Sequence, residues 1–302
     1  MTDIEFRTDM AFSYGEPTMV VPEVRRLVAN NPSVFTFKGT NTYILGSNAL
    51  AIIDPGPDDD AHFEATMRAV GRRRVSHILI THTHRDHIDG LPRLAKATGA
   101  TICGFGRASP ESGARKVSPS GTEFVDEGFV PDLVLKDGDE VAGDGWAVRA
   151  MFTPGHAPDH LCFAMPDQNV IFSGDHVMGW NTSVVAPPEG NMQDYMASLE
   201  RMAEGADAVY FPGHGGRIEK GSRIARAYLV HRRLREQSIL EAIQGGHGTI
   251  KDIVTLIYRE LDPRLFRAAS LSVEAHVDHL IERGRVAKDD GAATATAMLR
   301  AV

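Results

Sequence analysis

Three histidines and one aspartate lie within six residues, at His82-Thr83-His84-Arg85-Asp86-His87. Imidazole nitrogens and carboxylate oxygens are the ligands that zinc and similar divalent ions prefer in proteins. The apolar run Val75 to Thr81, which precedes them, is typical of a buried strand. Because a strand end holds side chains on a rigid backbone beside a crevice, this spacing predicts a metal site rather than a polar turn with surface histidines.

Three further apolar runs end in the same way. Trp146 to Phe152 is followed by Thr153-Pro154-Gly155-His156, Val170 to Phe172 by Ser173-Gly174-Asp175, and Ala208 to Phe211 by Pro212-Gly213-His214. A glycine next to a ligand suits a backbone that bends sharply and approaches an ion closely. Four strands are therefore expected to end in a histidine or an aspartate that could bind metal.

Strand and helix patterns alternate along the first two thirds of the chain. After an irregular lead-in over residues 1–30, strands are expected at 34–37, 41–45 and 49–53, and helices after Asp60, at 90–97 and at 192–202. The Ser-, Gly- and Pro-rich residues 106–125 show no pattern that places them. Antiparallel strand runs interrupted by helices suit a four-layer α/β/β/α sandwich of the α/β class.

The four ligand motifs, in this order and over roughly residues 30–216, resemble the motif set of the metallo-β-lactamase fold superfamily. The resemblance implies the sandwich fold and two zinc ions, with iron or manganese as alternatives. It implies that one ion is bound by His82, His84 and His156, and the other by Asp86, His87 and His214, with Asp175 bridging the two.

The C-terminal part of the chain shows a different pattern. Helical spacing over 223–243, 249–258 and 270–283, followed by a short strand at 285–287, is the order of a winged helix. The run Tyr228 to Gln237, together with Phe172-Ser173-Gly174-Asp175, resembles the β-lactamase-like protein 2 group, which joins a hydrolase domain to such a module. This implies a hydrolase domain over residues 1–216 and a linking helix with a winged-helix domain over 217–302.

Two divalent ions that share a carboxylate would form a hydrolytic centre. Bound zinc lowers the pKa of water to about 7, so a metal-bound hydroxide could attack an ester-type bond. Asp86 is a candidate catalytic group that orients this hydroxide. His160 is either catalytic, through second-sphere contacts or substrate polarisation, or a loop imidazole satisfied by backbone. Candidates for substrate binding, with an ordinary polar loop as the alternative, are Asn41, Trp180, Asn181 and Thr182.

Several substrates remain open on sequence grounds. The resemblance to the β-lactamase-like protein 2 group implies endoribonuclease-type cleavage of single-stranded RNA. The alternative is a glyoxalase II-like thioesterase, or another acyl or lactone hydrolase. A third hypothesis is a nucleic-acid-binding protein that acts through the winged helix, although packing or dimerisation is the favoured role for that module. The net charge of −8 offers little general attraction to phosphate.

Composition is that of an ordinary globular chain. The 302 residues are 42% hydrophobic and 24% charged, and no apolar run reaches membrane-spanning length. The two cysteines, Cys103 and Cys162, lie in apolar runs and are expected to be buried thiols. A cytoplasmic location is expected because no secretory signal pattern begins the chain, and this argues against β-lactam hydrolysis as the task. No membrane partner is expected, and a homodimer is left open.

Overall fold

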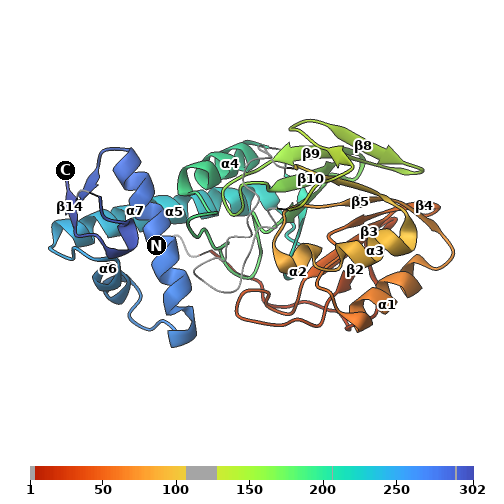
Figure 1. Ribbon diagram of the computed structural model, residues 1–302, viewed down its shortest axis with the longest axis horizontal. Coiled ribbons are helices and arrows are strands. Elements are labelled where there is room, and N and C mark those ends of the chain that lie inside the picture. The colour runs from red at the N-terminus through yellow and green to blue at the C-terminus, as the bar shows by residue number, and fades with distance from the viewer. Residues whose placement is uncertain (1–3, 107–127, 206, 290) are drawn as a thin grey trace.

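Two β-sheets lie face to face in the computed structural model of this protein, and helices cover their outer faces (Figure 1). The structure describes residues 4–106, 128–205, 207–289 and 291–302. The segment expected to be irregular at 106–125 therefore falls almost entirely outside the described residues. Among those residues, no helix is both long enough and apolar enough to cross a membrane.

The first sheet contains the strand that precedes the histidine cluster. Its strands β1 to β4 are antiparallel neighbours, whereas β4 to β7 are parallel because helices connect β4 to β5 and β5 to β6. In sheet order the strands are β1 (Thr18–Val21), β2 (Val24–Val28), β3 (Asn41–Leu45), β4 (Ala49–Ile53), β5 (Arg74–Leu79), β6 (Thr101–Gly104) and β7 (Leu133–Val134). The helices are α1 (Asp60–Val70), the short α2 (Arg85–Ile88) and α3 (Leu91–Thr98).

The second sheet carries the other three ligand motifs. Its strands β8 to β11 are antiparallel, and β12 adds in parallel to β11 after the crossover helix α4 (Met192–Glu204). In sheet order the strands are β12 (Val209–Pro212), β11 (Val170–Gly174), β10 (Leu161–Met165), β9 (Trp146–Phe152) and β8 (Glu140–Gly143), with a 3-10 turn at Pro166–Gln168.

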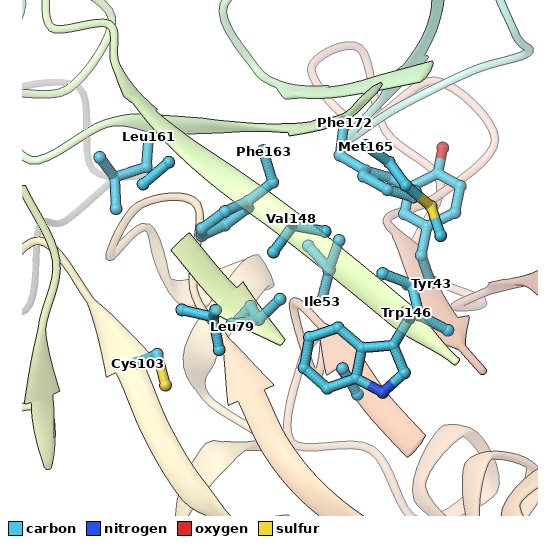
Figure 2. Packing of buried hydrophobic residues seen from close by; sticks show 14 of the residues in the cluster. Tyr43, Ile53, Leu79, Cys103, Trp146, Val148, Leu161, Phe163, Met165 and Phe172 are labelled. Carbon is cyan, nitrogen blue, oxygen red and sulfur yellow. The ribbon is translucent and has the colours of Figure 1, made fainter. Parts of the chain in front are cut away.

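The main core lies between the two sheets. Ile53 and Leu79 of the first sheet pack in one buried cluster with Val148 and Phe163 of the second (Figure 2). A second apolar cluster lies between the first sheet and helices α1 and α3, and a third lies between the second sheet and helix α4. These clusters define the four layers of the predicted sandwich, and both cysteines are buried free thiols, as expected.

The N-terminal part differs from the prediction. Residues 34–37 form a turn instead of a strand, because Ser33 Oγ accepts hydrogen bonds from the backbone N–H groups of Phe35 (3.1 Å) and Thr36 (3.0 Å). The supposed lead-in contains strands β1 and β2. Strand β2 was not predicted because Arg25 and Arg26 interrupt its apolar residues. Arg26 is nevertheless buried and donates a hydrogen bond to the carbonyl of Ala11.

The C-terminal part begins with helix α5 (Gly221–Gln244), which runs out of the sandwich toward the end of the chain (Figure 1). Tyr228 and Leu229, in its first half, pack in the cluster that also contains α4, whereas Ile239 and Ile243, near its end, belong to a separate C-terminal core. That core is completed by α6 (Ile250–Ile257), a 3-10 turn (Pro263–Leu265), α7 (Phe266–Glu282), a second 3-10 turn (Thr294–Thr296) and the antiparallel ribbon of β13 (Val286–Lys288) and β14 (Leu299–Ala301). Helix α5 thus begins just after the expected boundary at residue 216 and joins the two parts as one continuous element.

Candidate metal centre

Three histidine side chains meet at the ends of strands β5 and β9. Nδ1 of His84 lies 3.0 Å from Nε2 of His82 and 3.0 Å from Nε2 of His156. All three side chains are buried, and their ligand atoms lie within 4.8 Å of one another. Three converging imidazole nitrogens form a ligand set for a borderline divalent ion.

A second cluster combines Asp86, His87 and His214, whose ligand atoms also lie within 4.8 Å of one another. Nε2 of His214 lies 3.3 Å from Oδ2 of Asp86. Asp175 stands between the two clusters, with Oδ2 3.1 Å from Nε2 of His214 and 3.8 Å from Nε2 of His156. The structure therefore brings all seven predicted ligands together, and one carboxylate reaches toward both groups.

In four of the five ligand histidines, the ring nitrogen that faces away from the centre is fixed by a protein oxygen. Nδ1 of His156 donates to the carbonyl of Val184 at 2.6 Å, and Nδ1 of His214 donates to the carbonyl of Gly39 at 3.3 Å. Such contacts select the tautomer in which the opposite nitrogen carries a lone pair toward the metal. Nε2 of His87 and Oδ1 of Asp175 are buried without a hydrogen-bond partner. Unused lone pairs at these positions fit a bound cation, so the residues present match a metal pair.

Asp54 organises the first motif from behind. Its Oδ2 accepts hydrogen bonds from Nδ1 of His87 (2.9 Å) and from the hydroxyl of Thr81 (2.7 Å), while Oδ1 accepts the backbone N–H of Thr81 (2.8 Å). The same Thr81 hydroxyl lies 2.9 Å from Nδ1 of His82. Sequence reasoning missed this residue, although the signal was present: Asp54 ends the apolar strand β4 in the way that the ligands end theirs.

The charges of the centre are unevenly divided. Burial alone would raise the pKa of Asp86 and Asp175, but the imidazoles of His87 and His214 outweigh it and hold both values well below normal. Burial alone would lower the pKa of His214, but Asp175 and Asp86 raise it to about 10. The pKa of His82 is lowered by burial and by the neighbouring imidazoles. Without metal, protons therefore occupy the carboxylate-rich half, while His82 is neutral and available as a ligand.

Glycines leave room for the ligands. A Cβ atom on Gly213 would lie 2.3 Å from Oδ1 of Asp175 and 2.7 Å from Cε1 of His87, which is closer than real contacts allow. A Cβ atom on Gly174, whose φ is +48°, would lie 2.6 Å from Nε2 of His160. Gly213 is thus required by the close approach of the chain to the ligands, and Gly174 by its close approach to His160.

The two predicted catalytic residues lie in different surroundings. Asp86 is half-buried at the centre, and its Oδ2 accepts a hydrogen bond from the hydroxyl of Thr40 at 2.8 Å. His160 is fully buried, with Nδ1 2.9 Å from Oγ1 of Thr153 and Nε2 accepting the backbone N–H of Asp175 at 3.1 Å. Because both nitrogens of His160 are occupied, its contacts favour a positioning role for this residue over substrate polarisation.

Asn41 does not lie where the prediction put it. Its side chain is fully buried, and Nδ2 donates hydrogen bonds of 2.9 Å to the carbonyls of Pro212 and Gly215. It therefore secures the loop that carries His214 instead of facing a substrate. A polar residue at a strand start carries no sequence signal that separates these two roles.

The other three substrate-binding candidates, Trp180, Asn181 and Thr182, line one cavity of about 270 Å³. Trp180 stacks on Phe37, with ring centroids 4.9 Å apart. The cavity lies between the loop that follows Asp175 and the C-terminal helices α5 and α7 with the segment that precedes α7. Its apolar lining comes from distant parts of the chain and includes Phe6, Val34, Phe35, Tyr258, Leu261 and Leu265.

Comparison with known families agrees with this architecture. The family model described as the metallo-beta-lactamase superfamily matches residues 35–214, and the beta-lactamase associated winged helix domain matches residues 249–294. The chain therefore belongs to the metallo-beta-lactamase superfamily and carries its associated winged helix. The predicted fold and the prediction of a metal-dependent hydrolase are confirmed.

Individual relatives narrow the assignment. The beta-lactamase-like protein 2 homolog of Drosophila melanogaster is 32% identical over 279 residues, covering 89% of this chain and 91% of that protein, which confirms the resemblance to that group. The atrochrysone carboxyl ACP thioesterase of Aspergillus fumigatus is 31% identical over 232 residues, covering 76% of this chain and 67% of that protein. The chain spans 66% of the length of another relative, the lactamase-like protein adaB of Aspergillus niger, at 33% identity.

A solved structure shows the same fold. The beta-lactamase domain protein from Burkholderia ambifaria matches with a TM-score of 0.81 at 22% sequence identity, covering 99% of this chain and 97% of that one. The agreement includes the C-terminal part as well as the sandwich, because nearly the whole of both chains is covered.

Proposed function

We propose that this protein hydrolyses acyl thioesters and uses two zinc ions. The observation that carries the proposal is the convergence of seven ligand side chains in two clusters, with Asp175 in reach of both. The similarity to the fungal protein named an atrochrysone carboxyl ACP thioesterase supports a thioester as the bond that is cut. Imidazole and carboxylate ligands would also suit iron or manganese.

His82, His84 and His156 would hold one ion, and Asp86, His87 and His214 the other, with Asp175 shared. When bound, such a pair supplies Lewis acidity and a water molecule of lowered pKa. Asp86, fixed by Thr40, would accept a hydrogen bond from the attacking water and orient it toward the carbonyl carbon. The water oxygen bonds to the acyl carbon and the C–S bond breaks, so the products are a carboxylic acid and a thiol.

The metal pair and the reaction can be tested together. Purified protein loaded with zinc, iron or manganese is analysed by mass spectrometry for metal content and assayed on thioesters, lactones, phosphodiesters and RNA. We expect two equivalents of metal and turnover of thioesters. His84→Ala should lose one equivalent and most of the turnover, whereas the matched variant His247→Ala, far along the chain in the turn after α5, should keep both. Full turnover by His84→Ala would rule out this centre as the active site.

The second candidate is cleavage of single-stranded RNA. It is favoured by the similarity to the Drosophila beta-lactamase-like protein 2 homolog, which covers 91% of that protein and so includes the C-terminal domain. The same ligands would then act on a phosphodiester. In the substrate panel above, RNA cleavage that is lost in His84→Ala, without thioester turnover, would favour this candidate over the first.

A further inference from the structure

Helix α5 presents three basic residues to the cavity beside the metal centre. His231, Arg232 and Arg235 all line it and lie one helical turn apart or less on α5. They belong to the run Tyr228 to Gln237, which the metal centre does not use. A cationic group inside a largely apolar cavity requires a compensating partner, because its desolvation is costly.

The described residues provide no acidic partner for these guanidinium groups. Arg232 is buried and donates hydrogen bonds to the carbonyl of Ser183 and to Ser272 Oγ, which are both uncharged. Arg235 lies with its Cζ 4.4 Å from the centre of the Tyr258 ring and forms no ion pair or hydrogen bond with any described residue. Tyr258 therefore provides an aromatic face for Arg235 but no negative charge.

Acidic groups on the same helix are already engaged elsewhere. The carboxylate of Glu236 contacts His279 at 2.5 Å and Arg283 at 3.8 Å. Arg233, which points away from the cavity, is paired with Glu200 at 2.6 Å. Burial is the main cause that lowers the pKa of His231 to about 4, and the nearby Arg232, Arg235 and His276 act in the same direction.

Several nitrogen atoms of the cavity lining also lack partners. Four of its residues carry a buried side-chain nitrogen without a hydrogen-bond partner: Trp180 Nε1, His231 Nδ1, Arg232 Nε and Arg235 Nε. Buried polar groups in folded proteins are nearly always satisfied, so four exceptions around one cavity indicate a missing ligand rich in acceptors.

The cavity adjoins the metal centre through two of its lining residues. The carbonyl of Val184 accepts the hydrogen bond of His156 Nδ1 at 2.6 Å. Trp180 packs against Gly215, next to His214, where an added Cβ atom would lie 2.7 Å from Trp180 Cδ1. Val184 therefore separates the cavity from His156 of one metal cluster, and Trp180 with Gly215 separates it from His214 of the other.

We propose that this cavity binds an anionic group of the substrate, with Arg235 and Arg232 as its cationic contacts and the apolar lining around the adjoining carbon skeleton. This inference rests on the proposed thioester hydrolysis. A volume of about 270 Å³ suits an acyl group or a short linker better than a folded macromolecule. The anion would be either a carboxylate of the acyl part or a phosphate of the thiol part.

Matched substrates separate the two sources. Thioesters of succinate and of its monomethyl ester, each made with pantetheine and with 4′-phosphopantetheine, differ only in the acyl carboxylate or in the phosphate. For Arg235→Gln we expect the ratio of kcat/KM between the anionic and the neutral member of one pair to fall about tenfold or more, as for a lost charge-assisted contact. A fall in the pair that differs in the carboxylate identifies the carboxylate, and a fall in the pair that differs in the phosphate identifies the phosphate. Arg233→Gln, from the opposite face of the same helix, should preserve both ratios.

Absence of thioester turnover would refute the proposed function but would leave anion binding by the cavity untested. A direct binding measurement tests anion binding in either case. Fluorescence of Trp180 reports on the cavity directly, with Trp180→Phe as the blank. Wild-type protein should bind 3-phenylpropionate about tenfold more tightly than neutral 3-phenylpropanamide, and Arg235→Gln should remove that preference. Equal affinity of both compounds for wild type would overturn the proposal. It would also be overturned if Arg235→Gln weakened binding of a short single-stranded oligoribonucleotide and left both compounds unaffected.

Discussion

Gly213 offers a direct test of how closely the chain surrounds the metal ligands. Replacing it by alanine adds a methyl carbon 2.3 Å from Oδ1 of Asp175 and 2.7 Å from Cε1 of His87. The backbone cannot retreat easily, because the N–H of Gly213 donates to the carbonyl of Gly174 (2.8 Å) and its carbonyl accepts from Asn41 (2.7 Å). The ligands must therefore move, and the change acts on the cluster that contains His87.

Overpacking at such a site lowers the stability by about 1–3 kcal/mol. Displacement of the ligand side chains is expected to weaken metal binding by about 10–100-fold, the effect of losing a contact that supports a ligand. The assay is a chelator competition that resolves two binding steps. We expect Gly213→Ala to weaken one step by this factor and to affect the other less. Gly216→Ala is the matched control, because its nearest contact would be an ordinary 3.4 Å to the carbonyl of Asp9. If both metal-binding steps of Gly213→Ala kept their wild-type affinities, the added methyl group would not displace the ligands and the reasoning would be refuted.

Three further predictions concern the surroundings of the centre. Asp54→Asn should weaken one metal-binding step about 10–100-fold in the same competition, because it alters the acceptor that holds His87, while exposed Asp58→Asn should not. Because the pKa of His214 is raised to about 10 without metal, metal uptake at pH 7 should release protons and tighten as pH rises toward that value. Titration calorimetry in two buffers of different ionisation enthalpy measures this release, and identical heats in both would contradict it. Asn41→Ala should lower the free energy of unfolding by about 2 kcal/mol, measured by denaturant, because the carbonyl of Gly215 loses this donor and that of Pro212 keeps only the Tyr43 hydroxyl. An unchanged unfolding midpoint and slope would show that this hydrogen bonding is dispensable.

The ligands were predictable because each one interrupts a local apolar pattern. His82, His156, Asp175 and His214 all follow strand-like runs, and the sheets bring those strand ends together. The role of Asn41 was not predictable, since the carbonyls it holds lie more than 170 positions away in the chain. Such a contact exists only after both sheets have formed, and no local periodicity encodes it.

The cavity shows the same limit on sequence reasoning. Phe6, Trp180, Arg235 and Leu265 become neighbours only through packing of the C-terminal helices against the loop after β11. Strand β2 was missed for a local reason: Arg25 and Arg26 obscure its apolar alternation, although both side chains reach backbone carbonyls inside the fold. The apolar pattern of the sequence is therefore least informative for polar residues whose hydrogen-bond partners come from distant parts of the chain.

The continuity of helix α5 has a consequence for how specificity can change. One end of this helix is embedded beside α4 and the other anchors the winged helix, so a rigid rod joins the two parts with no intervening hinge in the helix. Substitutions on the C-terminal helices can reshape the far wall of the cavity while the ligand-bearing strand ends keep their positions. The metal ligands and the residues that select the substrate therefore belong to different parts of the chain, and each part can change without the other.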